Sequence, residues 1–242
     1  MRTSARSALT ALLAGLVLAA PASVGAAGAH AASADPGVTA TPEVVTTTGV
    51  AGRTIAITVD DGPDPRATPQ LLEVLAENDA RAVLCLWGDH VRQHPELVRQ
   101  AVAGGHQLCG HTQTHPDLGT WSPMRASVEI RRGVRSIERA VPGAEVTWFR
   151  APYGSWGAST DVAADLDLQP LGWQATIEDW VPPGSDVLLQ RLKDATAPGA
   201  VVLVHDGGGD RTQTVEALAQ WLPWLREQGY EVVLPVRPAE RD

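Results

Sequence analysis

Two adjacent carboxylates and a spaced pair of imidazoles are the residues of this sequence best suited to chemistry. They are Asp60-Asp61 and His111-x-x-x-His115. Two histidines and one carboxylate form a ligand set suited to zinc or a similar divalent ion, and three protein ligands leave one position open for water. The other carboxylate could be the general base that takes a proton from that water. His205 is then a candidate general acid for a leaving group. Taken alone, the histidine pair would equally fit two solvated loop side chains.

Other chemistries have weaker support. The sequence holds no G-x-S-x-G, the motif of a nucleophile-elbow serine hydrolase. It also lacks G-x-x-x-x-G-K-[ST] and G-x-G-x-x-G, so no motif supports nucleotide binding. Adjacent carboxylates make a poor glycosidase pair, because that chemistry needs roughly 5 to 9.5 Å between the two groups. The net charge of −9 and the pI near 5.2 argue against nucleic acid as a partner.

An alternation of apolar strands and helices surrounds these residues. Apolar runs predict buried strands at Thr54–Val59, Ala82–Trp87, Val146–Phe149 and Ala200–Val204, with weaker candidates at Gln107–Cys109, Leu171–Ala175 and Glu231–Leu234. Helical patterns begin at Thr68, His94, Asp186 and Thr212, and another runs from the N-cap Ser122 to about Ala140. This alternation indicates an α/β fold with a parallel sheet covered on both faces. About seven such units in a single domain favour closure into a barrel over an open sheet.

The ionisable residues fall where the predicted strands end. The five clusters are Asp60-Asp61, His111 with His115, Arg150, Glu178-Asp179 and His205-Asp206. In parallel β/α folds the loops beyond the carboxyl ends of the strands carry the functional site. One Asp or His there would most simply be a helix cap or a turn residue. Five clusters at five strand ends indicate one shared site.

Five short motifs carry a more specific signal. In chain order they are TVDDGPDP (Thr58–Pro65), HTQTH (His111–His115), RAPYG (Arg150–Gly154), EDW (Glu178–Trp180) and LVH (Leu203–His205). Their order and spacing resemble the five motifs of the polysaccharide deacetylases, also called carbohydrate esterase family 4 or the NodB-homology domain. The resemblance extends from about Ala51 to Leu234.

The resemblance implies a distorted (β/α) barrel of about seven parallel strands that removes acetyl groups from a glycan with the help of Zn²⁺ or another divalent cation such as Co²⁺. By similarity, the metal ligands would be Asp61, His111 and His115. Asp60 would be the base, held in place by Arg150, and the backbone N–H of Tyr153 would bind the oxyanion. His205 would be the acid, oriented by Asp179. Trp180 and Leu203 would form an apolar wall near the acetyl methyl, with Tyr153 also binding substrate. The sequence departs from the family pattern at Val59, Gly110 and Thr176, none of which is a ligand, base or acid in this assignment.

The N-terminus has the pattern of a secretory signal peptide, which we place at residues 1–31. Arg2 and Arg6 precede the apolar run Leu9–Ala20, and small residues follow. The run is shorter than the 20 or so residues that a membrane-spanning helix needs, although an uncleaved anchor is the alternative. Residues 32–50 read as a linker and residues 51–242 as the deacetylase domain. We therefore expect a secreted protein that contacts no membrane after cleavage.

The cysteines, tryptophans and glycines support further expectations. Cys85 and Cys109 are the only cysteines, on predicted neighbouring strands, so an exported chain would form a disulfide between them. Two buried free thiols are the alternative.

Trp121, Trp156 and Trp180 are candidates for stacking on sugar rings, whereas Trp87, Trp221 and Trp224 are expected in the core or between helices. Gly207–Gly209 would let the chain turn after His205, where the site needs backbone close to substrate.

The function that we predict is a secreted, metal-dependent deacetylase that hydrolyses N-acetyl groups of a β-linked amino-sugar glycan. Peptidoglycan N-acetylglucosamine and chitin-type oligomers are the leading substrates, and a monomer is the expected state. An acetylxylan esterase using the same site is one alternative. A catalytically silent glycan-binding protein is the other, and the complete set of ligands, base and acid argues against it.

Overall fold

The structure is a computed structural model in which residues 42–238 are described. The predicted signal peptide, at residues 1–31, and the first part of the predicted linker lie outside the described residues. Between residues 42 and 238, no helix is both long and apolar enough to cross a membrane.

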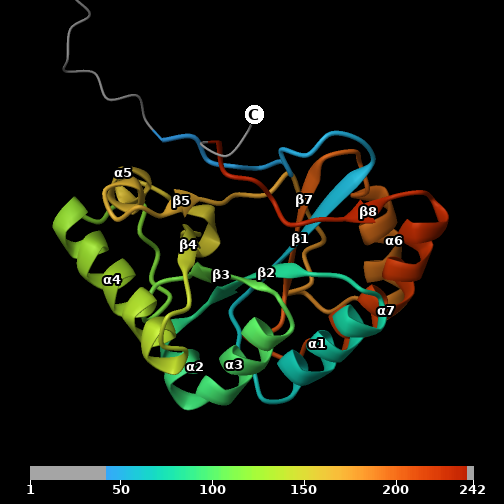
Figure 1. Cartoon of the computed structure of the whole chain (residues 1–242), viewed down its shortest axis with the longest axis horizontal. Coiled ribbons are helices and arrows are strands. Elements are labelled where there is room, and N and C mark those ends of the chain that lie inside the picture. Colours follow the sequence, from blue (N-terminus) through green and yellow to red (C-terminus); the bar gives the residue numbers. More distant parts are fainter. Residues whose placement is uncertain (1–41, 239–242) are drawn as a thin grey trace, which may run out of the picture. The chain divides into compact units, whose positions relative to one another are not determined.

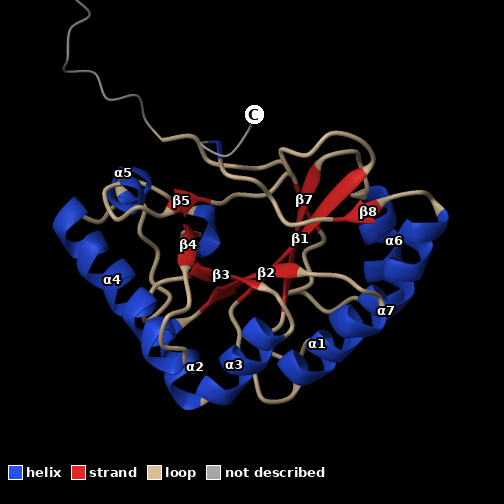
Figure 2. Cartoon of the chain, in the orientation of Figure 1, coloured by secondary structure: helices blue, strands red, loops and turns tan. Residues whose placement is uncertain are grey.

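Strands and helices alternate along the described chain (Figures 1 and 2). The strands are β1 (Thr54–Asp60), β2 (Ala82–Leu86), β3 (Gln107–Gly110), β4 (Val146–Phe149), β5 (Gln169–Pro170), β6 (Ala175–Thr176), β7 (Ala200–His205) and β8 (Glu231–Val232). The helices are α1 (Ala67–Glu77), α2 (Gly88–Gln93), α3 (Pro95–Ala103), α4 (Pro123–Ala140), α5 (Ser159–Ala164), α6 (Ser185–Asp194) and α7 (Thr212–Glu227), with a 3₁₀ turn at Pro152–Gly154.

The strands form one curled parallel sheet in the order β5-β4-β3-β2-β1-β7-β6, and β8 adds a short pairing to β1. All seven residues of β1 are buried, as expected for a parallel strand covered on both faces. The helices lie around the outside of the curl (Figure 2). This arrangement confirms the predicted α/β fold, a distorted barrel of parallel strands.

The segment that precedes β1 pairs with the chain next to the edge strand β5 and with β7, the neighbour of the other edge strand β6. Val45 pairs with Leu171 beside β5, and Thr47 pairs with Ala200 at the start of β7. The side chains of Val45 and Thr48 are fully buried. The described part of the predicted linker therefore packs as part of the barrel wall.

The prediction of one strand over Leu171–Ala175 is wrong, because the two-residue strand β5 ends before it, at Pro170, and the two-residue strand β6 begins only at its last residue, Ala175. Between them the carbonyl oxygens of Leu171 and Gly172 turn to the buried guanidinium of Arg150, accepting hydrogen bonds at 2.9 and 2.7 Å. These carbonyl groups point to a side chain, and no strand runs between Pro170 and Ala175. The short helices α2 and α5 were also not predicted from the sequence.

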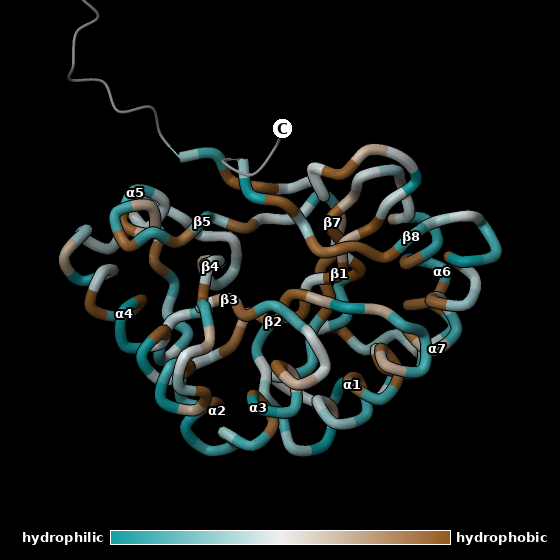
Figure 3. Tube along the Cα trace, viewed as in Figure 1, coloured by the Kyte–Doolittle hydropathy of each residue, from teal (hydrophilic) through white to brown (hydrophobic). Residues whose placement is uncertain are grey.

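Apolar side chains form one layer on each side of the sheet. Ile55, Ile57 and Val59 of β1 face outward into a large cluster shared with the surrounding helices. Inside the barrel, Val45 and Trp148 pack around the disulfide that joins Cys85 and Cys109 on neighbouring strands. Apolar residues accordingly follow the strands, and polar residues lie on the outward helix surfaces (Figure 3).

Candidate active site

The carboxyl ends of the strands open into one pocket of about 580 Å³. In the sheet, Asp60 at the end of β1 is level with Cys85 of β2 and His205 of β7, so these strand ends lie side by side. Of the residues predicted for the site, those that line the pocket are Asp60, Asp61, His111, His115, Tyr153, Trp180, Leu203 and His205. Arg150 and Asp179 do not line it, and each is hydrogen-bonded to a residue that does.

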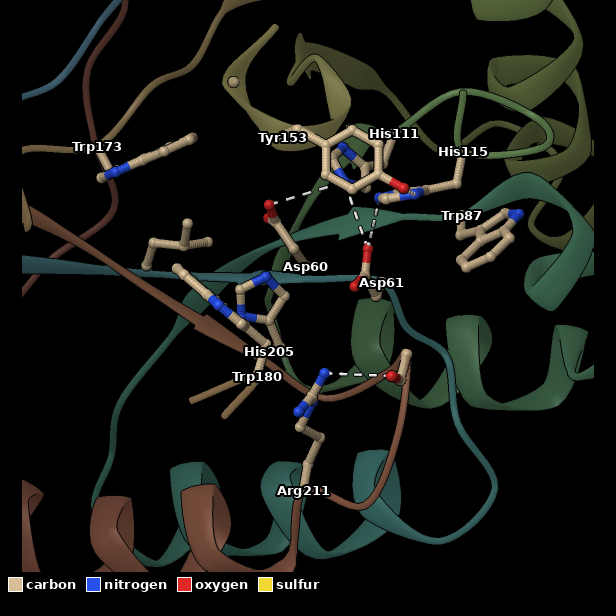
Figure 4. Close-up of a pocket in the computed structure, with 13 residues that line it drawn as sticks. Asp60, Asp61, Trp87, His111, His115, Tyr153, Trp173, Trp180, His205 and Arg211 are labelled. Atoms are coloured by element: carbon tan, nitrogen blue, oxygen red, sulfur yellow. Dashed lines mark hydrogen bonds and ion pairs between the residues drawn. The ribbon is translucent and has the colours of Figure 1, made fainter. Parts of the chain in front are cut away.

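Asp61, His111 and His115 converge on one point (Figure 4). Asp61 Oδ1 lies 3.0 Å from His115 Nε2 and 3.4 Å from His111 Nε2. This buried Oδ1 has no hydrogen-bond partner of proper geometry in the described structure. A buried carboxylate oxygen without such a partner, facing two imidazole nitrogens, is the donor set that zinc and similar ions require. The residues present therefore fit a divalent cation.

Hydrogen bonds leave the Nε2 atoms of both imidazoles available as ligands. His111 Nδ1 donates to the carbonyl oxygen of Arg150 at 2.8 Å, which fixes the tautomer with a free Nε2. His115 Nδ1 is 3.2 Å from the hydroxyl of Tyr153. Burial would raise the pKa of Asp61, but its contacts with the two imidazoles hold that pKa far below its usual range. Burial likewise opposes charge on His111, yet the nearby carboxylates of Asp60 and Asp61 raise its pKa.

Backbone strain is concentrated around these ligands. Asp61, Thr112, His115 and Tyr153 all have left-handed φ angles, of 73°, 65°, 58° and 60°. Non-glycine residues adopt this conformation only where surrounding contacts hold them there. One such contact comes from the buried Glu129 of α4, whose Oε1 accepts hydrogen bonds from both the N–H and the hydroxyl of Thr114, each at 2.6 Å. The loop between the two histidines is thereby held to α4.

Asp60 forms a buried ion pair with Arg150. Arg150 is fully buried, and its Nη1 donates to Asp60 Oδ1 at 2.7 Å and to Thr58 Oγ1 at 2.9 Å. Its other hydrogen bonds go to the carbonyl oxygens described above. Asp60 Oδ2 faces the ligand set instead, 3.8 Å from His111 Nε2. One carboxylate oxygen is therefore held by the guanidinium, and the other is directed toward the candidate metal ligands.

His205 is paired with Asp179 in a similar way. His205 Nδ1 donates to Asp179 Oδ1 at 2.7 Å, and Asp179 Oδ2 accepts from the His205 backbone N–H and from the hydroxyl of Thr214. Burial would lower the pKa of His205, but the hydrogen bond and charge of Asp179 outweigh it and raise that pKa. The raised pKa favours the protonated ring, and Nε2 is the nitrogen that Asp179 leaves free to release a proton.

The glycine turn after His205 approaches Asp61. A Cβ on Gly208, whose φ is +69°, would lie 2.8 Å from Asp61 Oδ2, and a Cβ on Gly207 would collide with the carbonyl oxygen of Asp61. Arg211 fastens this turn, donating to the carbonyl oxygens of Gly207 and Asp179 at 2.8 and 3.0 Å. The sequence predicted that these glycines bring backbone close to substrate. Gly208 lines the pocket, and both Gly207 and Gly208 also bring backbone close to Asp61, a candidate metal ligand.

Aromatic side chains form much of the pocket wall. Trp180 is half exposed and meets the ring of His205 edge-on, with centroids 5.5 Å apart. Of the other tryptophans proposed to stack on sugars, Trp121 and Trp156 pack against a separate cluster around Phe149 and do not line the pocket. The expectation that Trp87 belongs to the core was wrong, because it lines the pocket.

Five residues that line the pocket were not among the predicted catalytic, substrate-binding or metal-binding residues. They are Trp87, Gly154, Trp173, Gly208 and Arg211. Gly154 is the last residue of the RAPYG motif, and Trp173, Gly208 and Arg211 lie within six residues of a motif. Trp87 lies more than 20 residues from any motif, so no motif marked it. Gly154 has little freedom to change, because a Cβ there would lie 2.7 Å from the ring of Trp173.

Comparisons with known proteins agree with this geometry. Residues 48–171 match the family described as Polysaccharide deacetylase. The chain is 37% identical over 194 residues to a chitooligosaccharide deacetylase of Bradyrhizobium sp. (strain ANU 289), covering 74% of this chain and 88% of the relative. It is also 37% identical over 182 residues to a peptidoglycan-N-acetylglucosamine deacetylase of Bacillus cereus, covering 74% and 84%. Among solved structures, a CE4 family pseudoenzyme from Bacillus anthracis superposes with a TM-score of 0.73 at 29% identity, covering 79% of this chain and 66% of that one.

Proposed function

Because the chain belongs to the polysaccharide deacetylase family, we propose that it is a secreted, zinc-dependent enzyme that removes N-acetyl groups from a β-linked amino-sugar glycan. The leading substrates are chitin-type oligomers and the N-acetylglucosamine of peptidoglycan, the two substrates named for its relatives. Secretion is inferred from the signal-peptide pattern of residues 1–31.

Asp61, His111 and His115 would hold the cation. When bound there, a divalent ion supplies Lewis-acid polarisation of the acetyl carbonyl and a more acidic water. We assign the base to Asp60, which would accept a proton at Oδ2 because Arg150 occupies Oδ1. Arg150 fixes the orientation of this carboxylate.

His205 would donate the proton that the leaving group needs, from Nε2. Asp179 holds Nδ1, so it sets both the orientation and the proton affinity of the ring. The backbone N–H of Tyr153 is assigned to the developing oxyanion. Trp180 and Leu203 would exclude water around the acetyl methyl, since both line the pocket beside His205.

The pairing of His205 with Asp179 is the single observation that carries the choice of an amide substrate. An amine leaves a tetrahedral intermediate only after its nitrogen is protonated, whereas an alcohol leaves more easily. A histidine with a raised pKa, aligned by a buried carboxylate, meets that need. The ligands, base and acid are all present, which favours an active enzyme over a silent binder on the same fold.

The test compares acetate release from an N-acetylglucosamine oligomer, from peptidoglycan and from acetylated xylan. We expect release from one or both amino-sugar substrates at a higher kcat/KM than from xylan. Asp60→Asn should abolish it, whereas Asp165→Asn, an exposed carboxylate on α5's C-terminal end, should leave it unchanged. Faster release from xylan would replace the amidase assignment with an esterase. No release from any substrate by zinc-loaded protein would favour a silent glycan binder.

A further inference from the structure

The indole of Trp87 stacks on two imidazole rings next to the metal ligands. Its centroid lies 4.8 Å from that of His115, with an angle of 27° between the planes. The ring of His90, on α2, lies 4.2 Å away at 26°. Trp87 is the residue between β2 and α2, so the strand end and the helix start carry two members of this stack. Figure 4 shows Trp87 next to His115.

The stack connects two ligands of the candidate metal site. His90 Nδ1 donates a hydrogen bond to the backbone carbonyl oxygen of Asp61 at 2.8 Å. Asp61 in turn places its Oδ1 3.0 Å from His115 Nε2. The chain of contacts is therefore closed, from the Asp61 carboxylate through His115, Trp87 and His90 to the Asp61 carbonyl. A shift of the indole would disturb both ligands.

His115 needs such a support more than His111 does. His111 Nδ1 is fixed by a buried main-chain carbonyl, the usual partner of a metal-binding histidine. His115 Nδ1 instead faces the hydroxyl of Tyr153, a side chain that is 71% exposed. An exposed hydroxyl orients a ring weakly, because water competes for it. The face of Trp87 is the half-buried contact that restricts the imidazole of His115.

Ring contacts, rather than a hydrogen bond, hold Trp87 in place. Its buried indole N–H has no acceptor within the described part of the chain. A buried tryptophan usually donates a hydrogen bond from this N–H. Because Trp87 does not, we infer that stacking on the imidazoles sets the position of its ring. Replacing the indole therefore strands no hydrogen-bond partner, which makes substitution at this position a clean test.

We propose that Trp87 is a positioning residue for the metal site, with His90 as its anchor to Asp61. The proposal rests on the proposed function, because it assumes that Asp61, His111 and His115 bind a divalent cation. Groups that orient metal ligands typically change metal affinity by about 10- to 100-fold. Loss of the stack should thus weaken metal binding even in the absence of substrate.

The experiment measures Zn²⁺ and Co²⁺ binding to metal-free protein by competition with a chromogenic chelator. Trp87→Leu should lower the affinity by about 10-fold or more. Trp87→Phe, which keeps an aromatic face, should recover most of that loss. Trp224→Leu is the matched control, since Trp224 is a half-buried tryptophan on the outer helix α7 and should have no effect. The visible absorption of bound Co²⁺ should change in Trp87→Leu but not in the control.

His90 tests the closed chain of contacts. His90→Ala should weaken metal binding, and the Trp87→Leu/His90→Ala double variant should lose less than the combined single losses, because both changes break one stack. Additive losses would contradict the link through His90. If Trp87→Leu does not fold, His90→Ala still decides the matter, and full metal affinity in folded His90→Ala overturns the proposal.

Failure of the proposed function gives a different result. If the unaltered protein binds neither cation, the metal site itself is refuted. If the unaltered protein binds Zn²⁺ tightly and folded Trp87→Leu binds it equally well, only the role of Trp87 is refuted.

Discussion

Replacing Asp179 by Asn should separate the charge of this residue from its shape. Asp179 is buried, and its Oδ2 accepts two hydrogen bonds, from the His205 backbone N–H and from Thr214. In the variant the amide oxygen would take that position, because only an acceptor satisfies two donors. The amide NH₂ group then faces His205 Nδ1, which must accept rather than donate. The ring keeps a neutral tautomer and resists protonation.

The expected size of the fall in rate follows from the contact between Asp179 and His205. A carboxylate at hydrogen-bond distance typically shifts the pKa of its partner by about 1 to 3 units, and one unit corresponds to about 1.4 kcal/mol. His205 Nδ1 and Asp179 Oδ1 are 2.7 Å apart, and both side chains are largely buried, so solvent screens the pair weakly. Loss of the charge should lower the pKa of His205. At a pH above both values, the rate should fall by about 10- to 1,000-fold.

The assay is the pH dependence of kcat/KM for acetate release, compared with the Asp165→Asn control. The basic limb of the profile should move to lower pH in Asp179→Asn and stay in place in the control. The free energy of unfolding should also depend on pH through His205. Because the folded-state pKa of His205 is raised, the pair stabilises the fold below the unfolded pKa of about 6.5, and that contribution disappears as pH rises through the folded pKa. A basic limb at the same pH as in the unaltered protein would refute the reasoning.

Three further changes have defined outcomes. Glu129→Ala leaves the N–H and hydroxyl of Thr114 without their acceptor, so it should lower the free energy of unfolding in urea by about 1 to 3 kcal/mol and weaken zinc binding. Gly208→Ala and Gly229→Ala both place Ala at a left-handed φ, costing about 1 to 2 kcal/mol each, but only Gly208→Ala meets Asp61 and should impair zinc binding. Equal zinc affinity in the two glycine variants would contradict the close approach. Replacing both cysteines by alanine removes a disulfide that joins residues 24 positions apart and should destabilise the protein to urea by about 3 kcal/mol.

The sequence predicted the parts of the site that depend on strand ends. Apolar runs mark buried parallel strands, and their carboxyl ends share one edge of the sheet. That reasoning predicts that Asp60, His111 and His205 lie together, and the structure brings them to one pocket. The disulfide between Cys85 and Cys109 followed from the same logic, because both lie on neighbouring strands.

The sequence could not reveal contacts that arise between distant segments. Trp87 ends an apolar run and was assigned to the core, since nothing in its own segment indicates a stack on His115. The strand predicted at Leu171–Ala175 does not form. Its first two carbonyl oxygens accept hydrogen bonds from Arg150, some 20 residues earlier in the chain. Glu129 lies in a helix with no motif, so its hold on the loop between the histidines becomes visible only in three dimensions.

Zinc titration of metal-free protein, with acetate release from an N-acetylglucosamine oligomer as the readout, tests the central claim most directly. The account predicts no release without metal, recovery that is complete at one zinc per chain, and no recovery in Asp61→Asn. Full activity of the metal-free protein, or no acetate from protein that has bound one zinc, would contradict it.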